Sequence, residues 1–257
     1  MNLVCFFNLG NTCYINSVLQ AFIYDSPCLL KEITNENNDS TNEQCYDISE
    51  FISIFRKKYP QFRRFEQHDA HEFLLCFVDY INLIELGKTR LDIKCESCKN
   101  TNTIYEEFVS IDLSVPDTNE IVSIFSLFKE YLGSELNDEN NLYFCDRCDS
   151  FVCSQKKTFL WKVPKKLIIS LKRYSSCGKK ISTRIEYPEL LKIRETSTGE
   201  VIEYKLTCVV NHIGGLSDGH YNSFVHVLDN WYFMDDDICI PRNLHKNNSY
   251  MLFYNKL

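Results

Sequence analysis

Apolar residues recur at helical spacing near the start of the chain. Between residues 15 and 23 they follow the pattern i, i+3, i+4, i+7, i+8, which places them on one face of a helix. The positions are Ile15, Val18, Leu19, Phe22 and Ile23. The pattern predicts an amphipathic helix, with Cys13 just before its first turn or within it.

Two further helices are predicted before residue 90. The first ends before Pro60 and carries its apolar residues at Ile48, Phe51, Ile52 and Phe55. The second begins at Asp69, a good N-cap, with Glu72 three residues later as in a capping box. Its apolar stripe is Phe73, Leu74, Phe77, Val78 and Ile81. Residues 34–44 are polar and rich in Asn and Glu, which predicts a surface loop.

From Leu91 onward the pattern changes to short segments that alternate apolar and polar residues, as strands do. The predicted strands are residues 104–113, 167–174, 205–210, 220–228, 231–234 and 249–255, with one helix at residues 121–132. No internal repeat or long Pro/Gly/Ser linker interrupts this order. We therefore expect an α+β fold in which a helical N-terminal lobe packs against a β-rich C-terminal lobe.

Composition narrows the class of protein. A chain of 257 residues, 44% hydrophobic and 14% aromatic, can bury a substantial core. Its net charge of −7 argues against nucleic acid or an anionic membrane as the main partner. No run approaches the ~18 apolar residues of a membrane span, and residues 1–7 lack the basic region and cleavage site of a signal peptide.

The cysteines indicate the compartment. There are 13, an odd number in a long chain, and four of them form two Cys-x-x-Cys pairs. Such usage favours metal-bound, catalytic and buried thiols over a disulfide framework. We expect a reducing compartment, the cytoplasm or the nucleus.

The position of Cys13 suggests a nucleophile. At the start of a helix, unpaired backbone N–H groups and the positive end of the helix dipole favour thiolate over thiol. A catalytic thiolate also needs a histidine base, a group that orients this base, and donors for the oxyanion.

His220 is the favoured base among the six histidines. A glycine-rich stretch, residues 214–219, delivers it to the beginning of a predicted strand, which suits a group facing an open cleft. The next predicted strand ends in Asp235, Asp236 and Asp237. Strand pairing can place Asp235 beside His220, where a carboxylate fixes the tautomer of the imidazole. The alternative for such an acidic run is a solvated turn.

Two knuckles, Cys95/Cys98 and Cys145/Cys148, can each place two thiolates on one tetrahedral ion. Together they predict a structural Cys₄ zinc site that ties the base of the long segment between them. The alternatives are four reduced cysteines without metal, or a redox dithiol. The second is disfavoured because neither pair opens a helix after a strand.

In combination, these motifs resemble those of the ubiquitin-specific protease family of papain-like cysteine deubiquitinases. The Cys box corresponds to residues 8–20, a second signature to residues 67–74, and the His box to residues 219–221 followed by 231–237. Residues 161–174 and both knuckles lie between them in the order of the family. The resemblance covers nearly the whole chain.

The resemblance implies a role for individual positions. Cys13 matches the nucleophile, His220 the general base and Asp235 the third member of the triad. Asp236 matches the usual backup of Asp235, and Asn8 matches the side-chain donor of the oxyanion hole. The implied substrate-binding positions are Gln67, His68, Asp69, Gly214, Gly215, Gly219 and Tyr221. Among them, Asp69 matches a residue that holds the arginine-rich tail of ubiquitin.

The resemblance also implies a single catalytic domain, residues 1–257, shaped like a right hand. Its regions are a helical thumb (1–90), zinc-bearing β fingers (91–163) and a β-rich palm (164–257). The implied partners are structural Zn²⁺ and ubiquitin or ubiquitinated proteins, with no nucleic acid and no membrane, and we expect a monomer. The thumb and fingers are shorter than usual, and Asp218 stands where the family often has glycine or serine.

The expected function is hydrolysis of the peptide or isopeptide bond after the C-terminal glycine of ubiquitin. One alternative is a protease for another ubiquitin-like modifier, since the catalytic residues would be the same. A catalytically silent ubiquitin-binding scaffold is disfavoured because Cys13, His220 and Asn8 are all present. A zinc-dependent nucleic-acid-binding module is disfavoured by the acidic balance of the chain.

Overall fold

The computed structural model describes residues 3–34, 45–62, 65–82, 84–136, 142–215 and 218–257. Its helices are α1 (Cys13–Ile23), α2 (Pro27–Thr34), α3 (Ser49–Lys58), α4 (Ala70–Ile81) and α5 (Ile124–Tyr131). The three helices predicted before residue 90 are confirmed as α1, α3 and α4. The sequence pattern missed α2, whose last residue is Thr34. The rest of the predicted loop, residues 35–44, lies outside the described residues.

Helix α1 is more deeply buried than an amphipathic pattern implies. All eleven of its residues are buried, because it packs against α2, α4 and the strands behind it. Its polar side chains donate hydrogen bonds to groups inside the protein. The Gln20 side chain donates to the carbonyl of Val4 at 2.7 Å. The nucleophile candidate therefore begins a helix that is held on all sides.

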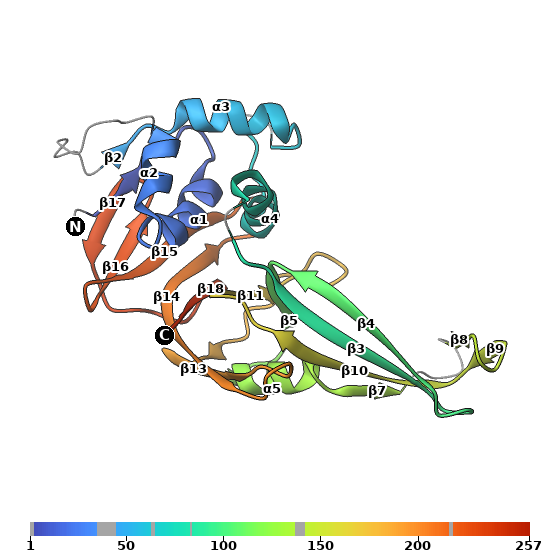
Figure 1. Ribbon diagram of the computed structural model, residues 1–257. Coiled ribbons are helices and arrows are strands. Elements are labelled where there is room, and N and C mark those ends of the chain that lie inside the picture. The colour runs from blue at the N-terminus through green and yellow to red at the C-terminus, as the bar shows by residue number, and fades with distance from the viewer. Residues whose placement is uncertain (1–2, 35–44, 63–64, 83, 137–141, 216–217) are drawn as a thin grey trace.

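The palm is an eight-stranded sheet (Figure 1). Its strands are β5 (Ser110–Ser114), β11 (Lys166–Lys172), β13 (Leu190–Arg194), β14 (Val201–Ile213), β15 (His220–Val227), β16 (Asn230–Asp235), β17 (Ile238–Pro241) and β18 (Ser249–Lys256). They are ordered β17-β16-β15-β14-β18-β11-β5, and β13 also pairs with β14. All neighbours are antiparallel except β5 and β11.

Both faces of this sheet are covered, so its central strands are apolar on both sides. In β18, Met251 and Phe253 belong to the core shared with the thumb helices. The alternate residues Leu252 and Tyr254 belong to a second core on the opposite face, which includes α5. Side chains alternate between the two faces of a strand, and this assigns neighbouring residues to different cores.

The fingers are a four-stranded sheet, ordered β4-β3-β10-β7, that projects from the body (Figure 1). Its strands are β3 (Gly87–Cys95), β4 (Thr101–Phe108), β7 (Ser134–Leu136) and β10 (Ser154–Lys162), and a hairpin of β8 (Tyr143–Cys145) and β9 (Ser150–Val152) lies at its tip. The finger sheet starts at Gly87, before the change of pattern at Leu91. The strand predicted for residues 104–113 is divided, since β4 belongs to the fingers and β5 to the palm.

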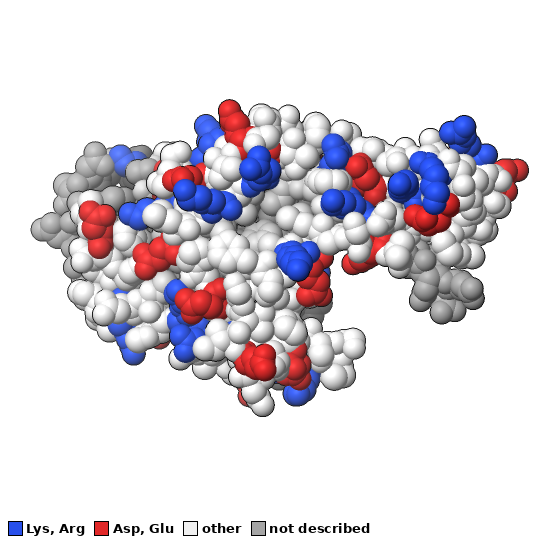
Figure 2. Space-filling model, turned by 90° about the horizontal axis from the view of Figure 1, so that it is seen from below, with Lys and Arg blue, Asp and Glu red and all other residues white. Residues whose placement is uncertain are grey.

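Two short parallel pairs complete the fold: β1 (Cys5–Phe6) with β2 (Cys45–Tyr46), and β6 (Val122–Ser123) with β12 (Ile185–Glu186). Figure 2 shows that the surface is hollowed between the body and the projecting fingers, with acidic and basic side chains interspersed on the face in view. In the described part of the chain, no helix has the length and apolar character needed to cross a membrane.

Candidate active site

Cys13 is the first residue of α1, as the sequence predicts, and its side chain is 4% exposed. It lines a cavity of about 230 Å³ between the thumb and the palm. The turn before the helix is shaped by Asn8, whose side-chain oxygen accepts hydrogen bonds from the backbone N–H of Gly10 (3.0 Å) and Thr12 (3.3 Å). Gly10 and Asn11 have positive φ values of 93° and 55°. This turn fixes where α1 begins, and therefore where the thiol lies.

His220 and Asp235 come together as strand pairing predicts. His220 is the first residue of β15 and Asp235 the last residue of β16, and Nε2 of the imidazole lies 2.5 Å from Oδ1 of the carboxylate. The hydrogen bond from His220 to Asp235, followed by one to Cys13, raises the pKa of His220 to about 10. Imidazolium is therefore stabilised beside the Cys13 thiol. A cysteine at a helix start beside such a histidine is the arrangement that cysteine-dependent hydrolases use.

Asp236 makes different contacts from those expected of a backup for Asp235. Its carboxylate accepts hydrogen bonds from the side-chain amides of Asn8 (2.7 Å) and Asn16 (2.8 Å). Burial raises the pKa of Asp236, and these two hydrogen bonds oppose that effect. The carboxylate thus holds the amide of Asn8 close to the beginning of α1.

Five of the seven predicted substrate-binding residues line the same cavity as Cys13. They are Gln67, His68, Asp69, Gly219 and Tyr221. Gly214 lines a separate neighbouring cavity instead, and Gly215 donates its N–H to the carboxylate of Asp218 at 3.2 Å. Residues 216 and 217, in the predicted glycine-rich stretch, lie outside the described residues.

Asp69 is both an N-cap and a wall of the cavity. Its carboxylate accepts from the backbone N–H groups of His71 (2.7 Å) and Glu72 (3.1 Å), which confirms the predicted cap of α4. The hydroxyls of Tyr221 (3.4 Å) and Tyr250 (2.5 Å) donate to its other oxygen. Glu72 lines the same cavity, so two carboxylates face this space.

A buried histidine fixes the position of the residue before His220. His212 is 3% exposed, and its Nδ1 lies 2.9 Å from the hydroxyl of Tyr174. Its ring stacks on Tyr221 with the centroids 4.4 Å apart. A Cβ added to Gly219 would lie only 1.9 Å from Nε2 of His212, so only glycine fits there. Burial lowers the pKa of His212 to about 4, which keeps the ring neutral near pH 7.

Several residues of the site were missed by the sequence analysis. They are Asn16, Tyr174, His212 and Tyr250. Asn16 offered a signal, because it is a polar residue inside an otherwise buried helix three positions after Cys13. His212 of β14 and Tyr250 of β18 are brought to the site by the register of the palm strands, and Tyr174 follows the end of β11.

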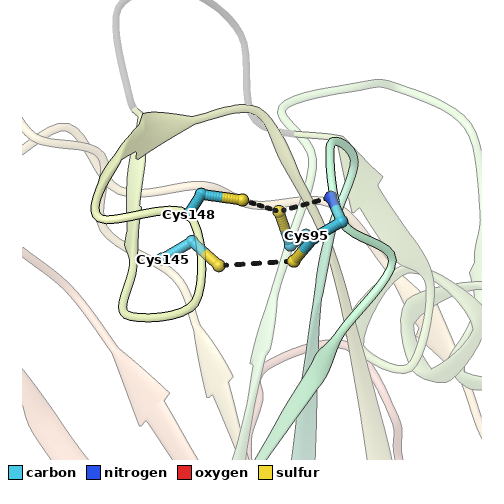
Figure 3. Close-up of side chains that lie close together, drawn as sticks. Cys95, Cys145 and Cys148 are labelled. Atoms are coloured by element: carbon cyan, nitrogen blue, oxygen red, sulfur yellow. Dashed lines mark hydrogen bonds between the residues drawn. The ribbon is translucent and has the colours of Figure 1, made fainter.

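The four knuckle cysteines form one cluster at the tip of the fingers. Their ligand atoms all lie within 4.8 Å of one another. The sulfurs are 3.8 Å apart for Cys95 and Cys148 and 3.7 Å apart for Cys98 and Cys145. Figure 3 shows the sulfurs of Cys95, Cys145 and Cys148 directed toward one another. Zinc–sulfur bonds of about 2.3 Å in a tetrahedron require sulfurs about 3.8 Å apart, so the cluster fits a zinc ion.

The family model for ubiquitin carboxyl-terminal hydrolases matches residues 4–254. The chain therefore belongs to the ubiquitin carboxyl-terminal hydrolase family. This confirms the resemblance to ubiquitin-specific proteases that its motifs carry.

Two curated relatives show the extent of this likeness. Ubiquitin carboxyl-terminal hydrolase 17 of Arabidopsis thaliana is 28% identical over 301 residues, which cover 96% of this chain and 41% of that protein. Ubiquitin carboxyl-terminal hydrolase 42 of Homo sapiens is 27% identical over 298 residues, covering 96% of this chain and 22% of that protein. The chain thus spans less than half the length of either relative.

Solved structures share the fold. The SAGA DUB module containing Ubp8, bound to monoubiquitin, matches with a TM-score of 0.80 at 21% identity, over 99% of this chain and 69% of that chain. The same module bound to ubiquitin aldehyde gives a TM-score of 0.77 at 21% identity, over 99% and 70% of the two chains. These matches confirm the α+β fold with thumb, palm and fingers.

Proposed function

We propose that this chain is a deubiquitinating cysteine protease that hydrolyses the bond after the C-terminal glycine of ubiquitin. The observation that carries the proposal is a hydrogen-bonded His220–Asp235 pair beside Cys13, the first residue of α1, in a chain of the ubiquitin carboxyl-terminal hydrolase family. The chemistry is acyl transfer through a thioester.

In the first half of the reaction the Cys13 thiolate attacks the carbonyl carbon of the terminal glycine. Asp235 occupies Nε2 of His220, which leaves Nδ1 to face the thiol and the leaving group. The imidazolium donates its proton to the departing amine, which is the lysine Nζ of an isopeptide bond. In the second half, His220 takes a proton from water, and the resulting hydroxide releases the acyl group.

Asn8 is the proposed side-chain donor of the oxyanion hole. Its amide lies in the turn that leads into α1 and is held by the carboxylate of Asp236. One of its two N–H groups is engaged there, and the second is available to the oxyanion. Backbone N–H groups at the start of α1 supply the remaining donors.

The cavity suits a basic peptide tail. Asp69 and Glu72 give one wall a negative charge, and Gly219 lines the same space. These residues, with Gln67, His68 and Tyr221, are the proposed contacts for the arginine-rich tail of ubiquitin. The hollow between the body and the fingers (Figure 2) is the proposed seat for its globular part.

The proposed metal is structural zinc held by Cys95, Cys98, Cys145 and Cys148. Four thiolates leave no open position for water, so zinc would stabilise the fingers without entering the reaction. None of the 13 cysteines forms a disulfide, which agrees with a proposed location in the cytoplasm or nucleus. A monomer is the proposed state.

The test is hydrolysis of a fluorogenic amide of the ubiquitin C-terminus by the wild type and by Cys13→Ala. We expect turnover by the wild type and none by the variant. Parallel reactions with amides of other ubiquitin-like modifiers show whether one of these, and not ubiquitin, is the substrate. Binding of ubiquitin without any turnover by the wild type would indicate the silent scaffold instead.

A further inference from the structure

Three thiols gather on the side of the thumb that packs against β17, apart from Cys13 and from the zinc knuckles. Cys5 in β1 is paired directly with Cys45 in β2. The Cys5 thiol also interacts with the thiols of Cys239 in β17 and of Cys45. Residues from three distant parts of the sequence therefore present thiols to one another.

This cluster holds the turn that directly follows Asp235 and contains Asp236. The turn, Asp236 and Asp237, joins β16 to β17. The N–H of Phe6, the neighbour of Cys5, donates to the carbonyl of Asp236 at 3.1 Å. The Cys45 thiol donates to the carbonyl of Asp237 at 3.2 Å. Cys239 lies opposite Met234, the residue before Asp235. A change in the cluster is therefore transmitted directly to the turn.

The two central sulfurs differ in accessibility and in acidity. Cys5 is 2% exposed, whereas Cys239 is partly exposed. The hydrogen bond from Cys5 lowers the pKa of Cys239 and raises that of Cys5. An accessible thiol with increased thiolate character reacts first with an oxidant, and a thiol in contact with it can resolve the product.

We propose that Cys239 and Cys5 form an oxidative modification site, in which a peroxide converts the pair to a disulfide and the new bond distorts the turn that follows Asp235 and contains Asp236. The Cys239 thiolate attacks one oxygen of hydrogen peroxide, and the O–O bond breaks to give the sulfenic acid and, with one proton, water. The sulfur of Cys5 then attacks the sulfenic sulfur, and its thiol proton leaves with the displaced hydroxide as a second water. Two thiols are oxidised by two electrons in total, and one peroxide is reduced to two waters.

The disulfide shortens the distance between β1 and β17, because bonded sulfurs are about 2 Å apart. This is shorter than the separation of two thiol sulfurs in van der Waals contact. The turn between β16 and β17 must move with them. Displacements near 1 Å at an active site cost on the order of 100-fold in rate. The expected loss of turnover, unlike the disulfide itself, rests on the proposed function of Cys13, His220 and Asp235.

The bond is mapped in Cys13→Ser protein, which removes the active-site thiol and needs no enzymatic activity. After treatment with hydrogen peroxide, mass spectrometry of a non-reduced digest should show the peptides of Cys5 and Cys239 cross-linked, and dithiothreitol should separate them. Recovery of both thiols unmodified, or of Cys45 joined to either of them, would overturn the proposal.

The consequence is measured by turnover in protein with an intact Cys13. Wild type, Cys239→Ser and the matched control Cys45→Ser are treated with peroxide and then assayed on the ubiquitin amide. Direct oxidation of Cys13 lowers all three alike. The wild type and Cys45→Ser should lose a further ten-fold or more in turnover, about the size expected for a displaced site, and dithiothreitol should restore it. Cys239→Ser should show no such further loss. Equal losses in all three would refute the coupling to the turn, while absence of turnover before oxidation would instead contradict the proposed function.

Discussion

Asp236 makes contacts that differ from those of its neighbour Asp235, the proposed third member of the triad. Asp235 faces His220, whereas Asp236 turns to Asn8 and Asn16. Its backbone is in the left-handed region, with a φ of 53°, and this reverses the direction of the chain after β16. Two adjacent aspartates therefore contact two different proposed groups: Asp235 contacts the base, His220, and Asp236 contacts the oxyanion donor, Asn8.

Asn16 contacts this carboxylate and not the proposed reacting groups, so its proposed role is to position Asn8. Asn16→Ala should lower kcat by about ten- to a hundred-fold with little change in KM, because Asn8 is no longer held in register. Asn8→Ala should cost about 100–1,000-fold. In a double-mutant cycle the two losses of kcat should not add, because both substitutions disable the same hydrogen-bond donor, the side-chain amide of Asn8.

Steady-state kinetics on the ubiquitin amide, with thermal unfolding as a check on folding, measures this cycle. Additive losses would show that Asn16 supports only the packing of α1.

The His220–Asp235 pair should make stability depend on pH. The folded pKa of His220, about 10, exceeds its ordinary value of 6.5. Its contribution to stability is therefore complete below about pH 6.5 and is lost as the pH rises toward 10. Asp235→Asn weakens the pair, so the variant should be less stable than the wild type near pH 6 and nearly equal to it near pH 10.

Urea unfolding across this pH range measures the difference. The effect will be moderate, because the His220 side chain is 41% exposed and solvent screens the pair. A stability difference between the wild type and Asp235→Asn that stays constant with pH would contradict a raised pKa of His220 caused by Asp235.

At the scale of elements, the beginning of β15 decides where His220 lies. Ile213, at the end of β14, is paired with His220, and the preceding residue, Gly219, rests against His212 of β14. The strand start is thus fixed by a ring of the neighbouring strand, and no property of the glycine-rich stretch alone would place it.

Gly219→Ala should displace His212 and lower both activity and stability, the latter by about 1–3 kcal/mol, as overpacking of a core does. The rescue is the second substitution, His212→Ala, which makes room for the added methyl group. Activity of the double variant should exceed that of Gly219→Ala. If it does not, the clash with His212 is not what makes glycine necessary.

At the scale of the molecule, the fingers are the part least supported by a core. Strand β4 is exposed over nearly its whole length, and the hairpin of β8 and β9 carries the exposed pair Phe144 and Phe151. The four sulfurs lie between this hairpin and the end of β3. A metal here would replace the packing that a larger core provides.

Cys98→Ser should therefore lose its zinc, with a larger effect on KM than on kcat because the cluster lies at the tip of the fingers (Figure 1). Elemental analysis should give one zinc per wild-type chain. Cys153→Ser is the matched control, since Cys153 is exposed and lies outside the cluster, and it should keep the metal. Absence of zinc from the wild-type protein would contradict the proposed Cys₄ zinc site.

Many elements of this fold are predictable from local sequence patterns, because the formation of a helix or a cap depends on residues close together in the chain. Helix α4 was predicted with its cap because Asp69 and its apolar stripe are short-range features. Helix α2 was missed, and 104–113 was predicted as one strand because alternation continues across the point where the chain passes from fingers to palm. Burial of all of α1 was also beyond the pattern, because it depends on strands that come much later.

Local sequence features specify the chemical groups and their settings: a thiol at a helix start, a histidine after glycines, two cysteine knuckles and an α+β order. Which of these groups meet depends on the tertiary fold. Asp236 contacts Asn8 and Asn16 across 228 and 220 positions, and Cys5 meets Cys239 across a similar separation. Periodicity reports which face of an element is buried, whereas contacts between distant segments follow from strand register and packing.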